Sequence, residues 1–318
     1  MIKKGKKITI LGAGNVGATC AYTLTLAGLV SEIVMVDVNA DKAKGEAMDI
    51  IQGTAFCPPV NIYAGSTTDA RDSDIVIVTA GIGRKPGQTR IDLAQTNVNI
   101  MRSLIPEVVK QAPHAIYLVV SNPVDILTYA ILKISGLPDN QVIGSGTMLD
   151  TTRLRTALAQ HVGINSHDVQ AYVFGEHGDT AMIPWSLTSI AGMQMWNFCE
   201  NVCKNHGNCG KQDLYAITDD VKTSGAKVIG LKGATYYAVA LAVRRICEAI
   251  VRDSSSVMTV SGLIHGQHGI HDVCLSLPFI VGAKGLEKEI TPPLTGEEEL
   301  QLMHSAEALR YVLNSLEI

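Results

Sequence analysis

The side chains best suited to acid–base chemistry stand in two short stretches of the second half of the chain, "MLDTTRLR" (residues 148–155) and "FGEHGDT" (residues 174–180). His177 lies between Gly175 and Gly178, which indicates a tight loop rather than a helix face. If Asp150 contacts His177, its carboxylate would fix the imidazole tautomer and stabilise the imidazolium that forms when a hydroxyl proton arrives. On this motif alone, a histidine with a purely structural role remains the alternative.

Three arginines could supply positive charge to such a site. Arg153 follows Asp150 by three residues, so both could face one way on a helix, although the same spacing also fits a surface ion pair of little energetic weight. Arg84 and Arg90 flank a Lys-Pro-Gly in "GIGRKPGQTRIDL" (residues 81–93). One guanidinium can bind a carboxylate through two parallel hydrogen bonds, and another can polarise a carbonyl that is being reduced.

The first half of the chain predicts a framework that binds a dinucleotide. "KKITILGAGNVG" indicates a β-branched strand and a glycine turn, in which Gly12, Gly14 and Gly17 have G-x-G-x-x-G spacing. In this motif the first glycine permits the tight turn, the second lets the backbone approach a pyrophosphate, and the third lets the helix pack closely on the strand. Asp37 ends a second strand twenty residues after Gly17, where a carboxylate can bind ribose hydroxyls and repel a 2′-phosphate. The pattern predicts NAD rather than NADP; a glycine turn without a ligand is the alternative.

Further strands are expected at residues 74–81, 115–123 and 141–146, with helices between them. This alternation is typical of a parallel, doubly wound sheet. Ligands bind beyond the carboxyl ends of such strands, which is where Gly81 and Asn122 stand. We therefore expect an α/β fold with two domains: a Rossmann-type NAD-binding domain over residues 1–146 and a mixed α+β catalytic domain over residues 147–318.

Together, the motifs "GAGNVG", "RKPGQTRIDL", "SNPVDILTY", "LDTTRLR" and "GEHGD" resemble those of the L-lactate/L-malate dehydrogenase superfamily, in the family's order and over nearly the whole chain. The resemblance implies specific roles: His177 as acid/base, Asp150 as its partner, Arg153 as carboxylate clamp, and Arg90 as the residue that polarises the carbonyl from a closing loop. It also implies that Asn122 orients the carbonyl, that Thr235 lines the substrate pocket, and that the protein is a homo-oligomer, either a dimer or a tetramer. The expected NAD site comprises Gly12, Gly14, Asn15, Val16, Gly17, Asp37, Gly81, Asn97 and Asn122.

The motifs disagree about the substrate. Glu176, Trp185 and Thr235 resemble residues of the lactate enzymes, whereas Arg84 stands where malate enzymes carry Arg and lactate enzymes typically carry Gln. If Arg84 faced the methyl group of pyruvate, burying its unpaired guanidinium would cost roughly 3 to 5 kcal/mol. One methyl group in a pocket typically changes the free energy of transition-state binding by only roughly 1 to 3 kcal/mol. We therefore expect oxaloacetate and L-malate as the substrate pair. The alternative is an L-lactate dehydrogenase in which Arg84 does not face the substrate; a non-catalytic NAD-binding regulator is a remote alternative.

Composition argues against several other functions. The formal net charge is −4 and no basic face is visible, so a nucleic-acid partner is not expected. Seven cysteines, an odd number, do not form a disulfide framework and favour a reducing compartment, here the cytoplasm. The N-terminal lysines and the charge-free run up to Ser31 imitate a signal peptide, but the glycine motif lies within that run. The charge-free residues 180–199 are too polar for a membrane span, so no membrane partner is expected.

Two other motifs give weaker signals. The stretch "CENVCKNHGNC" holds four metal-capable residues without a standard zinc spacing, so we expect a surface loop with free thiols and no metal at Cys199, Cys203, His206 and Cys209. Arg155 matches an arginine that binds fructose 1,6-bisphosphate in many bacterial lactate dehydrogenases, but Gln170 stands in place of the histidine. This departure puts activation by the sugar phosphate in doubt.

Overall fold

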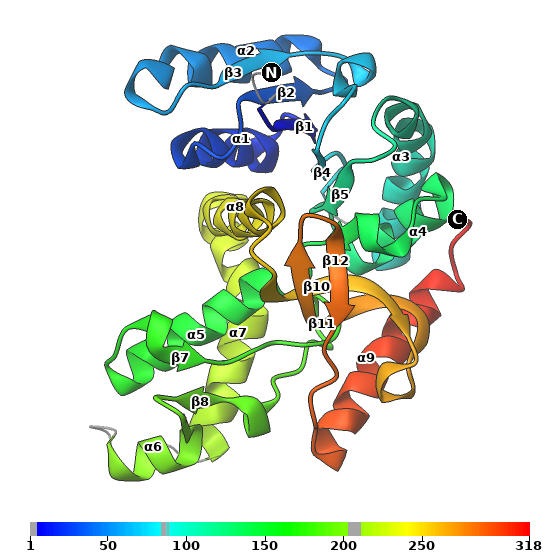
Figure 1. Cartoon of the computed structure of the whole chain (residues 1–318). Helices are drawn as coiled ribbons and strands as arrows, with labels where there is room; N and C mark the ends of the chain where they lie inside the picture. Colours follow the sequence, from blue (N-terminus) through cyan, green and yellow to red (C-terminus); the bar gives the residue numbers. More distant parts are fainter. Residues whose placement is uncertain (1–4, 84–86, 88, 203–210) are drawn as a thin grey trace.

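A nine-stranded sheet forms the centre of the molecule (Figure 1). The computed structural model describes residues 5–83, 87, 89–202 and 211–318. From edge to edge the strands lie in the order β12-β11-β10-β6-β5-β4-β1-β2-β3. The six strands β1 to β6 pair in parallel in the order 3-2-1-4-5-6, which is that of a doubly wound dinucleotide-binding fold. The expected fold class is thus confirmed.

The parallel part of the sheet alternates with helices along the chain. Its elements are β1 (Lys7–Leu11), α1 (Asn15–Ala27), β2 (Glu32–Val36), α2 (Ala40–Gln52), β3 (Asn61–Ala64), β4 (Ile75–Val78), α3 (Arg90–Gln111), β5 (Ile116–Val119), α4 (Val124–Ser135) and β6 (Val142–Gly144). Every residue of β1, β4, β5 and β6 is buried, because helices cover both faces of the sheet. In Figure 1, α3 and α4 lie on one side of these strands and α1 and α8 on the other.

The second half of the chain adds helices, a long hairpin and a small sheet. Its elements are α5 (Met148–Val162), β7 (Val169–Gln170), β8 (Ser189–Ile190), β9 (Met193–Gln194), α6 (Met195–Asn201), α7 (Lys211–Lys232), α8 (Tyr237–Arg252), β10 (Ser256–His265), β11 (His271–Gly282), β12 (Gly285–Glu289) and α9 (Gly296–Leu313). Short 3₁₀ helices span Thr54–Phe56, Thr67–Ala70, Asp139–Gln141, Ser166–Asp168, Trp185–Leu187 and Gln267–Gly269. The final helix begins with a capping box formed by Thr295 and Glu298.

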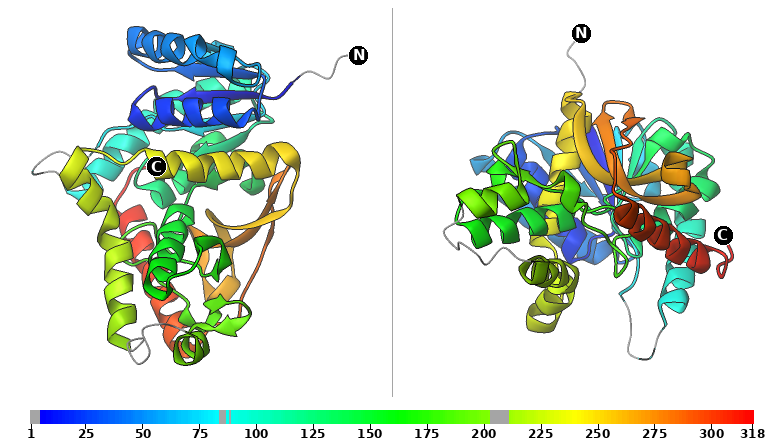
Figure 2. Two further views of the ribbon diagram at one scale, coloured as in Figure 1. Left: turned by 90° about the vertical axis from the view of Figure 1, so that its left-hand side faces the viewer. Right: turned by 90° about the horizontal axis from the view of Figure 1, so that it is seen from below.

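The hairpin β10–β11 extends the central sheet rather than forming a sheet of its own. Ser261 of β10 pairs antiparallel with Gly144 of β6, and β12 pairs antiparallel with β11. Strands from both halves of the chain therefore share one sheet, and the division at residue 146 stays a prediction. Helix α9 packs along β11, as the second view of Figure 2 shows.

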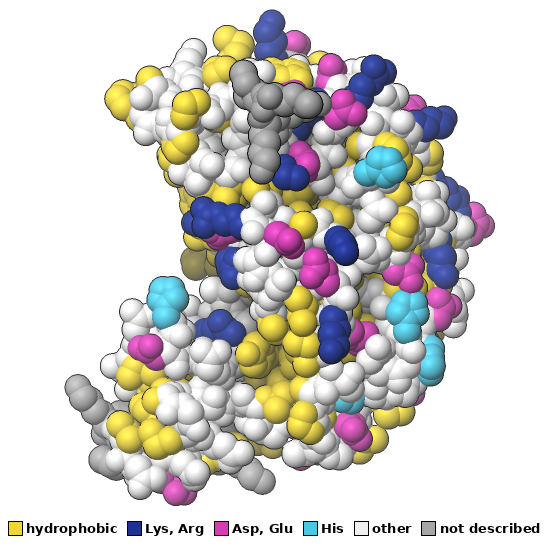
Figure 3. All heavy atoms as spheres, viewed as in Figure 1, with side chains coloured by type: hydrophobic (Ala, Val, Ile, Leu, Met, Phe, Trp, Pro, Cys, Tyr) yellow, Lys and Arg dark blue, Asp and Glu magenta, His cyan; other side chains and the backbone are white. Residues whose placement is uncertain are grey.

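The surface shows no segregation of charge on the face seen in Figure 3. There, Lys and Arg side chains are interspersed with Asp and Glu side chains, in keeping with the small net charge of −4. Within the described ranges, no helix combines the length and the apolar character needed to cross a bilayer.

Candidate active site

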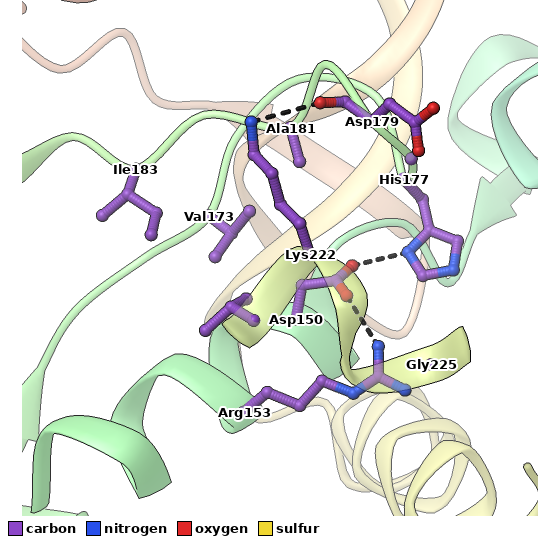
Figure 4. A pocket seen from close by; sticks show the side chains of 11 residues that line it. Asp150, Arg153, Val173, His177, Asp179, Ala181, Ile183, Lys222 and Gly225 are labelled. Atoms are coloured by element: carbon purple, nitrogen blue, oxygen red, sulfur yellow. Dashed lines mark hydrogen bonds and ion pairs between the residues drawn. The ribbon is translucent and has the colours of Figure 1, made fainter. Parts of the chain in front are cut away.

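His177, Asp150 and Arg153 meet around one small cavity (Figure 4). Nδ1 of His177 lies 2.5 Å from Oδ2 of Asp150, and Nη1 of Arg153 donates a hydrogen bond of 3.0 Å to Oδ1 of the same carboxylate. The cavity has a volume of about 130 Å³. This is small beside the roughly 300 to 1,000 Å³ of pockets for drug-sized ligands, so it suits a small molecule.

The start of α5 is fastened to the segment that leads into the histidine loop. Asp150 lies in the first turn of α5, and two nearby threonines, Thr147 at the N-cap and Thr151, bond to the main chain of Val173. Thr147 donates its hydroxyl to the carbonyl of Val173, and the hydroxyl of Thr151 accepts from the N–H of Val173 at 2.9 Å. Asp150 and His177 therefore face each other because a short hydrogen-bonded bridge fixes the distance between their backbones.

Facing charges decide the protonation of this pair. Burial by itself would lower the pKa of His177 and raise the pKa of Asp150. The ionic and hydrogen-bonding contacts outweigh it: Asp150 raises the pKa of His177 above its ordinary value, and His177 and Arg153 lower the pKa of Asp150 below its own. With the carboxylate bonded to Nδ1, Nε2 is the ring nitrogen that can exchange a proton with a ligand.

Asp125, which the sequence analysis did not single out, holds the backbone of His177. It lies in the first turn of α4, is 2% exposed, and its Oδ2 accepts a hydrogen bond of 2.7 Å from the main-chain N–H of His177. Burial raises the pKa of Asp125 to about 6. The available signal was a carboxylate within the apolar run "VDILTYAIL", because a buried charge of this kind needs a partner.

We expect Asp125→Ala to lower the free energy of unfolding by about 2 to 4 kcal/mol, because it leaves the N–H of His177 buried without an acceptor and opens a small cavity. Denaturant unfolding would measure the loss. Thr128→Ala is the matched control, because Thr128 is buried on the same helix and its hydroxyl donates to the carbonyl of Val124 within that helix. Equal losses in the two variants would contradict a specific tie between α4 and the histidine loop.

The structure brings Arg90 to the histidine loop but leaves Arg84 undescribed. Arg90 is the first residue of α3, where Thr89 and Asp92 form a capping box. Its exposed guanidinium forms an ion pair with Asp179, two residues after His177. Lys222 of α7 donates to the main-chain carbonyl of Asp179 at 3.1 Å. Arg84, on which the substrate prediction depended, lies outside the described residues.

The glycine turn has the shape that a pyrophosphate requires. Gly12 has φ +102°, and a Cβ on Gly17 would lie 1.9 Å from the carbonyl oxygen of Gly12, so neither position tolerates a side chain. Gly14 caps α1 without a side-chain bond, and a Cβ there would meet no atom within 4 Å. Helix α1 begins with Asn15 and Val16, and the main-chain N–H groups of this first turn can therefore donate hydrogen bonds to an anion.

Asp37 supports this turn directly. Its Oδ2 accepts from the N–H of Ala13 at 2.6 Å, and its Oδ1 accepts from the N–H of Asn39 at 2.8 Å. The carboxylate is half-buried, and its oxygens can accept further bonds. The residues at this end of the sheet therefore fit a dinucleotide whose adenosine ribose carries free hydroxyls rather than a 2′-phosphate.

Asn97 connects the loops that follow β4 and β5. Its Nδ2 donates to the carbonyls of Asn122, at 2.8 Å, and Ile82, at 3.2 Å, while its Oδ1 accepts from the N–H of Ile82 at 2.9 Å. Asn97 is buried and its amide bonds to main chain, which is the arrangement of a residue that positions Gly81 and Asn122. The Asn122–Pro123 peptide is cis. Thr235, between α7 and α8, is half-buried and is not among the described residues that line the cavity around His177.

The expectation of a surface loop with free thiols is wrong for Cys199, which lies within α6 and is buried. This residue is disulfide-bonded, whereas Cys203, His206 and Cys209 lie outside the described residues. Within the described part of the chain, no group of three or more His, Cys, Asp or Glu side chains could hold a metal ion.

Arg155 has partners of its own and does not line the cavity around His177. Its Nε donates to the carbonyl of Ala171 at 3.0 Å, and its guanidinium lies 5.4 Å from the centre of the Tyr172 ring. Gln170 is exposed on β7.

Known proteins resemble this chain over nearly its whole length. Residues 6–144 match the family model of the lactate/malate dehydrogenase NAD binding domain, and residues 147–317 match that of the lactate/malate dehydrogenase alpha/beta C-terminal domain. L-lactate dehydrogenase 1 of Clostridium acetobutylicum is 52% identical over 315 residues, which cover 99% of this chain and 100% of the relative. L-lactate dehydrogenase of Acetivibrio thermocellus is 50% identical over 313 residues, 98% of each chain.

Solved structures agree with these matches. The crystal structure of minor L-lactate dehydrogenase from Enterococcus mundtii superposes with a TM-score of 0.95 at 37% identity, over 99% of this chain and 100% of that one. A lactate dehydrogenase from a deep-sea metagenome library superposes with a TM-score of 0.93 at 35% identity, over 98% and 99%. The chain therefore belongs to the lactate/malate dehydrogenase family, as an NAD-dependent 2-hydroxy acid dehydrogenase.

Proposed function

We propose that this chain is an L-lactate dehydrogenase, which interconverts pyruvate and L-lactate. The observation that supports it best is that relatives about 50% identical over almost the full length are named L-lactate dehydrogenases. They favour the alternative of the sequence analysis over the expected oxaloacetate and malate. Glu176, Trp185 and Thr235 support the same substrate, because they resemble residues of the lactate enzymes.

The contacts around His177 support an acid–base role for it. In this proposal Arg153 binds the substrate carboxylate, and His177 gives a proton from Nε2 to the carbonyl oxygen during reduction and takes it back during oxidation. Asp150 keeps Nδ1 protonated and stabilises the imidazolium. Arg90 leaves its ion pair with Asp179 and polarises the carbonyl of the substrate. Asn122 and Thr235 orient the substrate.

The cofactor half supplies the second reactant. NADH, when bound, supplies the hydride. We propose that it is held by the glycine turn from Gly12 to Gly17, including Asn15 and Val16, by Asp37, and by Gly81, Asn97 and Asn122 at the strand ends. Residues 1–146 would then form the NAD-binding domain and residues 147–318 the catalytic domain of a dimer or tetramer.

The pH dependence should follow from the raised pKa of His177. Reduction needs the protonated imidazole, so kcat/KM for reduction should stay level below this pKa and fall as the pH rises through it. Because Asp150 raises the pKa above its ordinary value, the fall should be centred on the alkaline side of the pKa of a free histidine. Steady-state rates from pH 5 to 9 would measure it. A midpoint on the acid side would contradict the proposed protonation.

The substrate is decided by comparing kcat/KM for pyruvate and oxaloacetate at a fixed NADH concentration. A preference for pyruvate is expected. Malate dehydrogenase is the second candidate, and Arg84 is the residue that favours it, since a guanidinium can pair with the second carboxylate of oxaloacetate. A preference for oxaloacetate that Arg84→Gln reverses would replace the lactate proposal with the malate one.

A further inference from the structure

Asp125 carries a charge that the acid–base step described above does not use. Its side chain is buried, and its Oδ2 accepts the hydrogen bond of 2.7 Å from the main-chain N–H of His177. Its Oδ1 is also buried, and among the described residues this oxygen has no hydrogen-bond partner. A tie to one N–H needs only a neutral acceptor, such as the side-chain oxygen of an asparagine. Ionising a buried carboxylate costs free energy unless an opposite charge lies nearby, so the charge of Asp125 requires another explanation.

The groups packed around Asp125 include one that can balance this charge. Burial is the main cause that raises the pKa of Asp125, and the negative charge of Glu176 adds to the rise. Ser261 of β10 and His177 oppose it, the latter through its N–H and through the charge of its ring. Cys274 of β11 stays a neutral thiol, because burial raises its pKa. The imidazolium of His177 is thus a positive charge that stabilises the ionised carboxylate.

The same interaction acts on His177 in return. Burial lowers the pKa of His177, whereas the carboxylates of Asp150 and Asp125 both raise it and Arg153 opposes them. The carboxylate of Asp150 is shared, because it contacts the guanidinium of Arg153 as well as Nδ1 of the ring. One guanidinium therefore faces two carboxylates, and the charges of these four side chains balance only when the imidazole is protonated.

We propose that Asp125 is a positioning residue for proton transfer, whose buried carboxylate fixes the backbone of His177 and supplies a second negative charge that favours the imidazolium. This inference rests on the proposed function, because it affects reduction only if His177 is the proton donor. Two other charged side chains among the described residues line the cavity, those of Asp179 and Lys222. Asp179 is neutralised by its ion pair with Arg90 and Lys222 is positive, so neither can replace the negative charge of Asp125.

Replacing Asp125 by asparagine separates its charge from its shape. The amide oxygen can still accept from the N–H of His177, but the negative charge is lost. The midpoint of the alkaline fall in kcat/KM for pyruvate should therefore move to lower pH by roughly one unit. Asp125→Ala also lacks the charge and should show the same shift, so either variant serves if the other does not fold. NMR titration of the His177 ring in the NAD-bound protein, with His177→Asn to identify its signals, should show this shift without turnover.

Glu298→Gln is the matched control. Glu298 is also a buried carboxylate that accepts from a main-chain N–H of another segment, that of Ser186 at 3.0 Å, and it does not line the cavity around His177. Its amide variant should leave the midpoint unchanged. An unchanged midpoint in a folded Asp125 variant, or an equal shift in Glu298→Gln, would overturn the inference. A wild-type protein that oxidises NADH with neither pyruvate nor oxaloacetate would refute the proposed function, while the NMR titration would still decide whether Asp125 favours the imidazolium.

Discussion

Replacing Asp150 by asparagine is expected to lower kcat by roughly 10⁴-fold, the loss seen when the carboxylate that orients a catalytic histidine is neutralised. The physical reason is the 2.5 Å contact with Nδ1 of His177. An amide can present its own N–H to that nitrogen, which selects the wrong tautomer, and it no longer stabilises the imidazolium. Single-turnover oxidation of NADH with pyruvate would measure the chemical step.

The control for Asp150→Asn is Asp168→Asn. Asp168 is exposed, lies in the 3₁₀ turn Ser166–Asp168, and does not border the cavity around His177. The Asp168→Asn variant should retain the kcat of the wild-type enzyme. A loss below tenfold in Asp150→Asn, in a variant that still binds NADH and unfolds at the usual temperature, would show that the carboxylate does not assist His177.

Replacing Arg153 by lysine should lower kcat/KM for pyruvate by roughly 10²- to 10³-fold, mainly through KM. Lysine keeps the charge but loses the two parallel N–H groups that bind a carboxylate. It also removes the 3.0 Å hydrogen bond to Asp150, so part of the effect should reach the histidine. Initial rates over a wide range of pyruvate concentrations separate KM from kcat.

Arg155→Lys is the matched control for Arg153→Lys, two residues along the same helix. The guanidinium of Arg155 bonds to the carbonyl of Ala171 and packs on Tyr172, away from the cavity. Its kcat/KM should stay within about threefold of wild type, well under the factor of ten that 1.4 kcal/mol represents. If kcat fell in Arg153→Lys while KM stayed constant, Arg153 would not be the residue that binds the carboxylate.

The sequence predicted the structural elements that are determined by interactions between residues close together in the chain. Gly12, Gly14 and Gly17 predicted the turn between β1 and α1, because the turn requires a positive φ at Gly12, the helix packs too closely at Gly17 for a Cβ, and an open Gly14 lets the backbone approach a pyrophosphate. The start of α9 also has a local cause, the capping box of Thr295 and Glu298. The contact of Asp150 with His177 followed from motif resemblance, since no local rule brings together residues 27 positions apart.

What the sequence did not predict depends on distant partners. Strand β3 is four residues long with a single fully buried side chain, Ile62, so its pattern was too weak to detect. Asp125 was not singled out from the sequence, because its partner is a main-chain N–H of a remote loop. The pairing of β10 with β6 had no signal either, as apolar alternation identifies a strand but not its neighbour.

The shared sheet has a consequence for how the protein is made. Strand β6 leaves the ribosome more than a hundred residues before Ser261, the residue of β10 that pairs with Gly144. Until then the nucleotide-binding half has an open strand edge, with unpaired N–H and C=O groups along a buried, apolar strand. Such edges recruit other strands and promote aggregation. The hairpin β10–β11 thus covers the open edge of the sheet formed by the first half of the chain. Without the hairpin, that half would be prone to aggregate during synthesis.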